Sequence, residues 1–349
     1  MAEYNLFAHP RARAKLPESQ HWRRVMTWLG ILASTLAFAS AARGALPSHA
    51  HRVEAVRLGR GDSTLFGTLE IPVGYKRTPL AIFLSGSGPT NRDGNTPSAG
   101  IQSNCLKLLA RALEAQGVST LRYDKRGVGE SANAAVSEST LSVTTYSEDA
   151  RGWISRYRGD PRFSAIVLVG HSEGALIGTL AAERAPVDGL VLLAAAGRPI
   201  SQVLREQLGR QLTPDLMARS DSILAQLARG LSVDEVPSDL WSLYRPSVQP
   251  YLRSWLPLDP ADELKRVSAP VMVVQGTTDA QVSLEDVNRL VAARPDAVKL
   301  VIRDMNHVLK IASADLDSQR RAYVDSTLAL APGLAARVTD FVLGMKEKK

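Results

Sequence analysis

The sequence predicts an α/β protein whose mostly parallel central sheet carries helices on both faces. Short apolar runs alternate with segments of helical period over most of the chain. The run at residues 165–169 also lacks the polar alternation of a half-exposed strand, as a sheet covered on both faces requires. Residues 198–262 break the alternation and are helical in period, which predicts an inserted α-helical cap. The expected core is therefore formed by residues 46–197 and 263–349.

The elements of this core follow from local patterns. Residues 52–58 and 64–71 alternate between apolar and polar side chains, so they are expected to pair as strands around a turn at 59–62. Further strands are expected at 80–84, 118–122, 165–169, 190–194, 271–275 and 299–302, and helices at 102–116, 147–157, 173–184, 284–293 and 332–346.

The first 45 residues have the pattern of a secretory leader. Arg23 and Arg24 precede an apolar run that ends in small residues around Ala39 and Ala41. This predicts a periplasmic or secreted protein, with an uncleaved leader anchored in the inner membrane as the alternative. No stretch after residue 50 is long and apolar enough to suggest a membrane span in the mature chain.

Charge and cysteine content exclude several function classes. The net charge is +7, and residues 1–45 contribute +4 of it, since they contain six basic and two acidic side chains. The remaining basic residues form no stripe with interleaved aromatics, so no nucleic-acid partner is expected. The single cysteine, Cys105, allows neither an internal disulfide nor a cysteine metal site, and a buried place on a helix is expected for it. No metal or cofactor is predicted, and the oligomeric state is left open.

A serine nucleophile is predicted at Ser172. The segment Gly170-His171-Ser172-Glu173-Gly174 fits G-x-S-x-G and stands between a predicted strand and a predicted helix. A chain that reverses so sharply admits only small residues two positions either side of the serine. The hydroxyl is then presented at the carboxyl edge of the sheet, beside a helix N-terminus that favours negative charge.

The serine requires a base and an acid that orients the base. The mature chain has four histidines: His49 and His51 stand at its start, and the His171 side chain is expected to point away from the serine hydroxyl. His307, in the loop after the last predicted strand, is therefore the predicted base. Asp279 follows the strand that lies between serine and histidine in the sequence, and it is preferred as the acid over Asp304 and Asp286.

Two backbone N–H groups are expected to bind the oxyanion. One belongs to Glu173, next to the nucleophile. The other is assigned to Ser87, within one residue, in the glycine-rich turn after the strand at 80–84. In the cap, Trp241, Tyr244, Tyr251 and Trp255 are expected either to line a substrate pocket or to attach the cap to the core.

Several segments together resemble those of bacterial α/β-hydrolase fold proteins, in particular serine aminopeptidase-like hydrolases and similar esterases. These segments are SGSGPTNRDGN (85–95), RYDKRGVGES (122–131), GHSEG (170–174), QGTTDAQV (275–282) and MNHVLK (305–310). The resemblance runs from about residue 50 to the C-terminus and is weakest over the cap. It implies the α/β-hydrolase fold and carboxylic ester hydrolysis through an acyl-enzyme on Ser172, Asp279 and His307.

The expected function is therefore that of a serine hydrolase acting on a small-molecule ester. An acyltransferase and an amidase or N-terminal peptidase remain alternatives on the same three residues, as does a non-catalytic binding protein of the same fold. A peptidase would need an acidic pocket for the substrate amine, for which Glu173, Asp234 and Glu235 are candidates.

Overall fold

The computed structural model describes residues 51–135 and 137–345. The predicted leader at 1–45 lies outside the described residues, as does His49. In the described part of the chain, no helix is both long and apolar enough to cross a bilayer.

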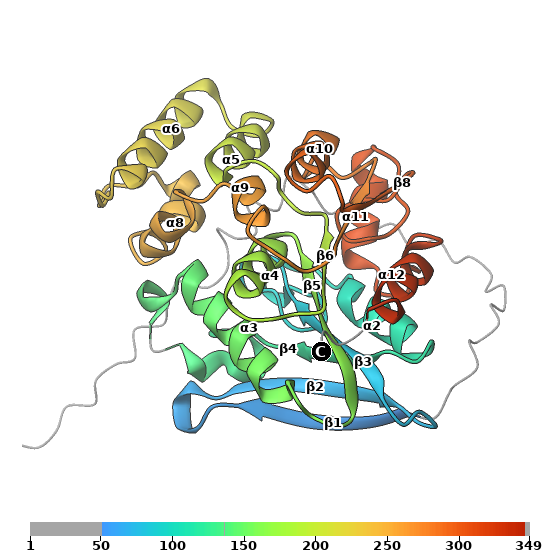
Figure 1. Cartoon of the computed structure of the whole chain (residues 1–349). Helices are drawn as coiled ribbons and strands as arrows, with labels where there is room; N and C mark the ends of the chain where they lie inside the picture. Colours follow the sequence, from blue (N-terminus) through green and yellow to red (C-terminus); the bar gives the residue numbers. More distant parts are fainter. Residues whose placement is uncertain (1–50, 136, 346–349) are drawn as a thin grey trace, which may run out of the picture.

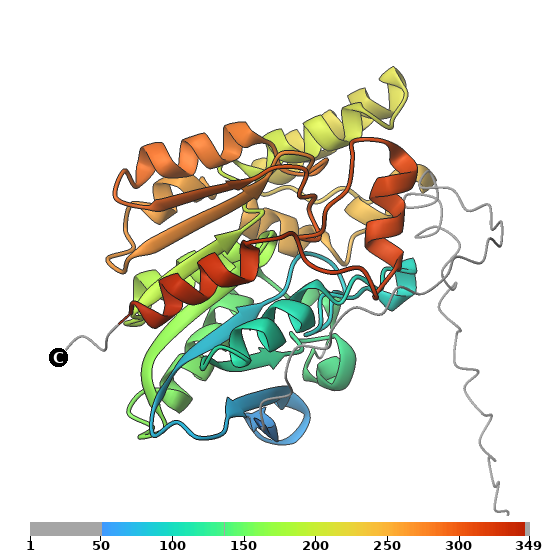
Figure 2. The same cartoon turned by 90° about the vertical axis from the view of Figure 1, so that its right-hand side faces the viewer.

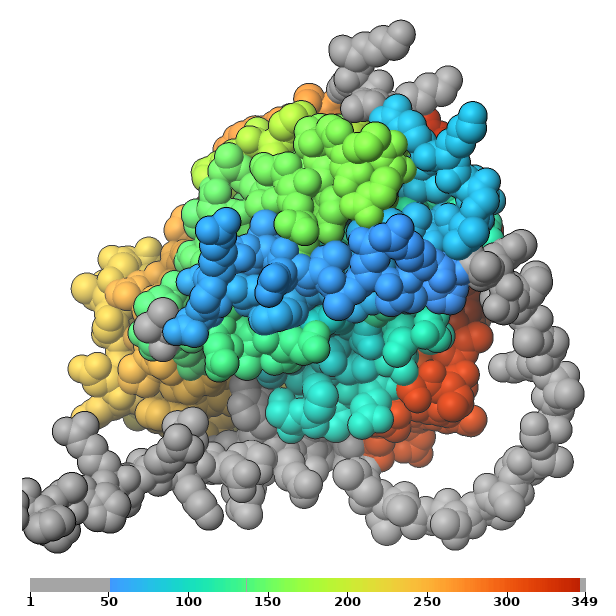
Figure 3. Space-filling view, turned by 90° about the horizontal axis from the view of Figure 1, so that it is seen from below, coloured from blue at the N-terminus to red at the C-terminus, as the bar shows by residue number. Residues whose placement is uncertain are grey.

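The described strands form one eight-stranded sheet of order β1-β2-β4-β3-β5-β6-β7-β8. The β1–β2 and β2–β4 pairs are antiparallel, and the other neighbours are parallel. The strands are β1 (His51–Leu58), β2 (Leu65–Pro72), β3 (Thr78–Leu84), β4 (Ser119–Tyr123), β5 (Phe163–His171), β6 (Gly189–Leu193), β7 (Val271–Gly276) and β8 (Val298–Ile302). The expected α/β architecture is confirmed, and the antiparallel pair forms one edge of the sheet (Figure 1). Figure 3 shows this pair, in blue, as a band across the face seen from below.

Helices cover both faces of the sheet. The core helices are α2 (Cys105–Glu114), α3 (Val143–Tyr157), α4 (Glu173–Arg184), α9 (Pro260–Leu264), α10 (Leu284–Ala293), α11 (Leu316–Val324) and α12 (Leu334–Leu343). Helices α3, α4 and α10 contribute to one apolar cluster, and α2 and α12 to another on the opposite face (Figure 2). Strand β3 is buried along its whole length: Leu80 and Ile82 belong to the first cluster, and Ala81 and Phe83 to the second. This period of two is what a strand between two helical layers requires.

The cap is made of α5 (Ile200–Gly209), α6 (Pro214–Ala228), α7 (Trp241–Tyr244) and α8 (Gln249–Trp255). It has a small apolar cluster of its own, composed of Ile223, Leu224, Leu227, Leu240, Tyr244 and Leu252. Thr213 caps α6 by accepting a hydrogen bond from the Leu216 N–H, and Pro214 follows as the first helical residue. Figure 1 places α6 and α8 at the opposite end of the molecule from β1 and β2.

Three predicted helices differ from the structure in their bounds, and one observed helix was not predicted. Helix α2 spans Cys105–Glu114 instead of 102–116. Helix α3 begins at Val143 instead of 147, because the Ser142 hydroxyl accepts a hydrogen bond from the Thr145 N–H and caps it there. Helix α12 begins after Gly333, whose φ of 81° is not helical, and is therefore shorter than 332–346. Helix α11 was not expected at all.

Candidate active site at the carboxyl edge of the sheet

Ser172 occupies the sharp turn between β5 and α4, with φ 55° and ψ −121°. A positive φ in a non-glycine residue stores strain, which surrounding structure must sustain. Two glycines make the turn possible: a Cβ on Gly170 would collide with Gly174 O, and a Cβ on Gly174 would collide with Leu84 O. The Ser172 N–H also donates to Leu193 O at 2.9 Å, which fixes the turn to β6. The small residues expected from the motif are therefore required by contacts.

The loop after β3 lies directly against this turn. A Cβ on Gly86 would stand 3.3 Å from the Ser172 Cβ and 3.4 Å from the His171 Nδ1. The loop is closed on itself, since the Ser85 hydroxyl donates to Thr90 O at 3.0 Å and the Thr90 hydroxyl to Ser87 O at 2.7 Å. The loop that carries Ser87 is thus fixed beside the serine.

Asp279 and His307 meet as a buried acid–imidazole pair. His307 Nδ1 lies 2.9 Å from Asp279 Oδ2, and the two side chains are 5% and 1% exposed. The other carboxylate oxygen accepts the N–H groups of Gln281 at 2.8 Å and Val282 at 3.0 Å. Burial by itself would raise the pKa of Asp279, but the His307 charge and these hydrogen bonds outweigh it, and the pKa lies below its ordinary value. Asp279 is therefore a stable carboxylate that holds the imidazole by Nδ1 and leaves Nε2 available.

The two loops meet because β7 and β8 are parallel neighbours. Gly276 ends β7 so close to the Met305 carbonyl that a Cβ would collide with it. The Thr277 N–H donates to Ile302 O at 3.1 Å and the Thr278 N–H to Met305 O at 3.2 Å. These bonds join the aspartate loop to the histidine loop.

His171 supports the same site from the nucleophile turn. Its Nε2 lies 2.8 Å from His307 O, and since a carbonyl only accepts, Nε2 carries the hydrogen. Burial, with the neighbouring His307 charge, lowers the pKa of His171 to about 4. His171 is a neutral donor that holds the His307 backbone, a role that the sequence did not suggest.

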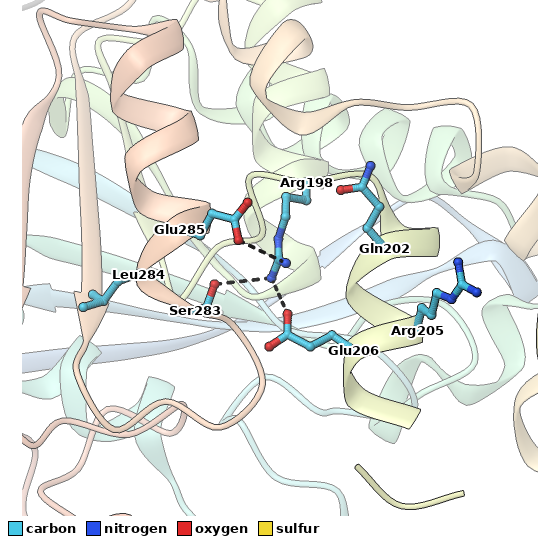
Figure 4. Close-up of a pocket in the computed structure, with 7 residues that line it drawn as sticks. All are labelled: Arg198, Gln202, Arg205, Glu206, Ser283, Leu284 and Glu285. Atoms are coloured by element: carbon cyan, nitrogen blue, oxygen red, sulfur yellow. Dashed lines mark hydrogen bonds and ion pairs between the residues drawn. The ribbon is translucent and has the colours of Figure 1, made fainter. Parts of the chain in front are cut away.

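The two competing acids are engaged elsewhere. Asp286 is fully buried and binds the Arg198 guanidinium at 2.9 Å. Arg198 lines a cavity of about 700 Å³. Figure 4 shows this side chain between α5 and α10, with Glu206, Glu285 and Ser283 around it. Asp304 is exposed and lies 3.5 Å from Arg303. Neither competitor replaces Asp279 as the partner of His307.

The four cap aromatics divide into two pairs. Tyr244 is fully buried, and its hydroxyl lies 2.7 Å from the Ser220 hydroxyl, so it packs inside the cap. Trp241 is 43% exposed and lines a cavity of about 510 Å³ that also contains Asp234 and Glu235 on the cap itself.

Tyr251 and Trp255 instead reach the core. Their rings are 6.0 Å apart, and Tyr251 lies 5.7 Å from the Tyr146 ring of α3. The Tyr251 hydroxyl donates to Glu173 Oε1 at 2.6 Å, next to the nucleophile. Through Tyr251, this pair contacts the residue next to the nucleophile.

Several polar side chains that complete the site were not predicted. Gln275 donates to Asp279 Oδ2 at 3.0 Å. Gln319 of α11 donates to Thr278 O at 3.1 Å and accepts from buried Asn306 at 3.3 Å, so the unexpected helix supports both loops. Lys125 lies buried beside Gly86. In the sequence these side chains carry no distinct signal, and Gln319 stands in a segment without an apolar stripe.

Known proteins resemble this chain in sequence and in fold. Over 266 residues the chain is 29% identical to Esterase EstD of Thermotoga maritima, an alignment that covers 74% of this chain and 62% of that relative. The fold is similar to that of Est1E from Butyrivibrio proteoclasticus with bound ferulic acid (TM-score 0.53, 18% identity, 80% of this chain and 92% of that chain). It is also similar to the Pyrococcus furiosus esterase PF2001 (TM-score 0.52, 17% identity, 88% and 96%).

The model of the alpha/beta hydrolase family matches residues 81–325, which include the serine turn, the cap and the acid–imidazole pair. The chain belongs to the alpha/beta hydrolase family.

Proposed function

We propose that this protein is a serine hydrolase that cleaves a carboxylic ester through an acyl-enzyme. The observation that carries this proposal is the hydrogen-bonded Asp279–His307 pair, at the same sheet edge as a strained serine turn. The His171–His307 hydrogen bond joins the loop of that pair to the serine turn. The likeness to Esterase EstD supports ester hydrolysis as the reaction, although the chain spans only 62% of that relative's length.

The proposed reaction has two steps. His307 Nε2 takes the Ser172 proton as Oγ attacks the ester carbonyl, and the N–H groups of Ser87 and Glu173 bind the oxyanion. The protonated imidazole then gives its proton to the departing alcohol, which leaves an acyl-serine. Water then attacks this ester while His307 takes a proton from the water, and His307 returns that proton to Ser172 Oγ as the carboxylic acid is released. Asp279 stabilises the imidazolium in both steps.

The environment of Glu173 favours an ester over an N-terminal amine as substrate. A peptidase of this kind needs an unpaired carboxylate near the serine to bind the amine. The Glu173 carboxylate is 3% exposed, accepts the Tyr251 hydroxyl, and lies 3.9 Å from the Lys125 ammonium. Asp234 and Glu235 line the cavity on the cap with Trp241. The acidic candidates are thus either paired or part of the cap.

Tyr146, Tyr251 and Trp255 support an apolar or aryl acyl group of modest size, because aromatic rings bury such groups favourably. A chain-length series of aliphatic and aryl esters tests this preference. Higher kcat/KM for long aliphatic esters would contradict it.

Fluorophosphonate labelling tests the proposed function. The wild-type protein is expected to be labelled at Ser172, as mapped by peptide mass, and to hydrolyse p-nitrophenyl butyrate. Ser172→Ala is expected to lose both properties while keeping its thermal unfolding temperature. Ser222→Ala, at an exposed position of α6, is the matched control and is expected to behave as wild type. Wild-type protein that is neither labelled nor active would contradict the proposal.

A further inference from the structure

Lys125 is a buried cation next to the proposed oxyanion site. It follows β4, is 5% exposed, and its ammonium donates a hydrogen bond to the Gly86 carbonyl. The anionic Glu173 Oε1 lies 3.9 Å from the ammonium, and the Tyr146 ring centroid lies 5.4 Å away. Burying an ammonium costs free energy unless it is paired. A methionine would fill a similar volume without that cost, so packing alone does not account for a lysine here.

The bonded carbonyl belongs to the peptide unit of the oxyanion donor. The Gly86 C=O and the Ser87 N–H are the two ends of one planar unit, and no cis peptide occurs among the described residues. In a trans unit the two groups point in opposite directions. An ammonium that holds the carbonyl therefore fixes the direction of the Ser87 N–H. Polarisation of the carbonyl also makes the N–H a stronger donor.

The same ammonium contacts the residue of the second donor. Glu173 is the first residue of α4, and its backbone N–H is among those that an α-helix leaves without an internal partner. The Glu173 carboxylate lies between the Lys125 ammonium and the Tyr251 hydroxyl. Lys125 thus joins the two segments that carry the donors, and Tyr251 extends this network to the cap.

We propose that Lys125 is a positioning residue that aligns the Ser87 and Glu173 N–H groups for the oxyanion. This role rests on the ester hydrolysis proposed above. The ammonium does not touch the reacting atoms. Because the alignment matters most when negative charge develops on the substrate oxygen, its loss should lower kcat far more than it raises KM.

The test compares Lys125→Met, Lys125→Gln and Lys125→Arg with wild type. For p-nitrophenyl butyrate, Lys125→Met is expected to lower kcat at least tenfold, toward the roughly 10²–10³-fold cost of losing one oxyanion donor, with KM nearly unchanged. A trifluoromethyl ketone forms an adduct with the serine hydroxyl, and this adduct carries an oxyanion. The affinity of Lys125→Met for the ketone should fall by the same factor as its kcat/KM. Lys125→Arg, which keeps the positive charge, should recover part of kcat. Lys125→Gln has a shorter, neutral hydrogen-bond donor. It replaces Lys125→Met in these measurements if Lys125→Met does not fold.

The matched control is Arg126→Met. Arg126 is the next residue in the same turn, and its guanidinium binds Asp149 at 2.7 Å instead of the Gly86 loop. This variant should unfold at lower temperature while it keeps kcat and ketone affinity. A merely structural role for Lys125 would make the Lys125→Met and Arg126→Met variants alike in both kinetics and ketone binding.

Two results separate the failure of this inference from the failure of the proposed function. If the wild type is labelled at Ser172 and active, but Lys125→Met keeps wild-type kcat and ketone affinity, only the role of Lys125 is overturned. If the wild type shows neither labelling nor turnover, the proposed function and this role both fail.

Discussion

At the scale of single residues, the buried histidine next to the nucleophile links the site to pH. His171 is 5% exposed and donates through Nε2 to the His307 carbonyl, and burial lowers its pKa from the ordinary 6.5 to about 4. Above pH 6.5 the imidazole is neutral in both folded and unfolded chains, so it contributes no pH dependence. Between about pH 6.5 and pH 4, the His171 imidazole is protonated in the unfolded chain but stays neutral in the folded chain. Stability therefore falls as the pH falls through this window.

The expected loss from His171 is roughly 3 kcal/mol of unfolding free energy between these pH values. Urea denaturation at a series of pH values from 4 to 7 measures it. His171→Gln keeps an amide donor but does not titrate, so its stability should vary less over this range than that of wild type. An equally steep loss of stability in this variant would show that other groups cause it.

The sequence predicts the chemistry of single residues better than their contacts. Ser172, His307 and Asp279 were chosen from a motif, from the small number of histidines and from strand order. The structure brings Asp279 and His307 together. The roles of His171, Gln275 and Lys125 depend on atoms between four and 136 positions away in the chain. No local pattern encodes the contacts of His171 and Lys125, because these follow from how parallel strands bring separate loops to one edge.

At the scale of elements, the first cap helix is attached to the loop that carries Asp279. Gln207 of α5 donates to Gln281 O at 2.9 Å, and Arg210 donates to Ala280 O at 2.8 Å. Just before α5 in the chain, Arg198 pairs with the fully buried Asp286 of α10. The cap thus supports the acid loop on one side, while Tyr251 contacts Glu173 on the other.

Replacement of Arg198 should show how strong this attachment is. Arg198→Met leaves the Asp286 carboxylate buried without its cation, and breaking such a pair costs about 3–5 kcal/mol of unfolding free energy. The double variant Arg198→Met/Asp286→Asn removes the uncompensated charge and should regain part of that loss. Guanidinium denaturation of the wild type, the two single variants and the double variant measures the coupling. Additive effects in this cycle would contradict the pairing.

The bounds of α4 and α10 agree with the predicted ranges. The nucleophile turn precedes the first helix, and in the structure Ser283 forms a capping box with Asp286 at the start of the second. Helix α11 was missed because only Gln319 and Ala322 of it are buried, so it shows no apolar stripe. Its start is set by Asp315, which caps the helix by accepting the Ser318 N–H.

At the scale of the whole molecule, stability is divided among separate clusters. Two large apolar clusters lie on opposite faces of the sheet, and the cap cluster is much smaller. Because local opening is easiest where few apolar side chains are buried, the cap should open before the sheet.

Hydrogen exchange followed by mass spectrometry tests this order. Peptides from α6 should exchange by local opening at denaturant concentrations where peptides from β5 and α4 stay protected. The Arg198→Met variant should widen the difference, since it weakens the link between cap and core. Simultaneous exchange of α6 and β5 would show that cap and core open as one unit.

The fold class could be predicted from the sequence because its main signals are periodic. Alternating strands and helices, an antiparallel start and an interrupting helical segment were all visible without structure. The position of the cap over the core was not predictable in this way. It depends on single contacts, such as Tyr251 with Glu173, between segments 78 positions apart.

The buried thiol of Cys105 has a practical consequence for the study of cap motion. This cysteine is the only one in the chain and is 1% exposed at the start of α2, and burial raises the pKa of its thiol. The thiolate is the reactive form of cysteine, so the Cys105 side chain should not react with maleimide reagents at neutral pH in the folded protein. A cysteine introduced at Ser222 would then accept a fluorescent dye selectively, and the movement of the cap could be observed in the otherwise unaltered protein.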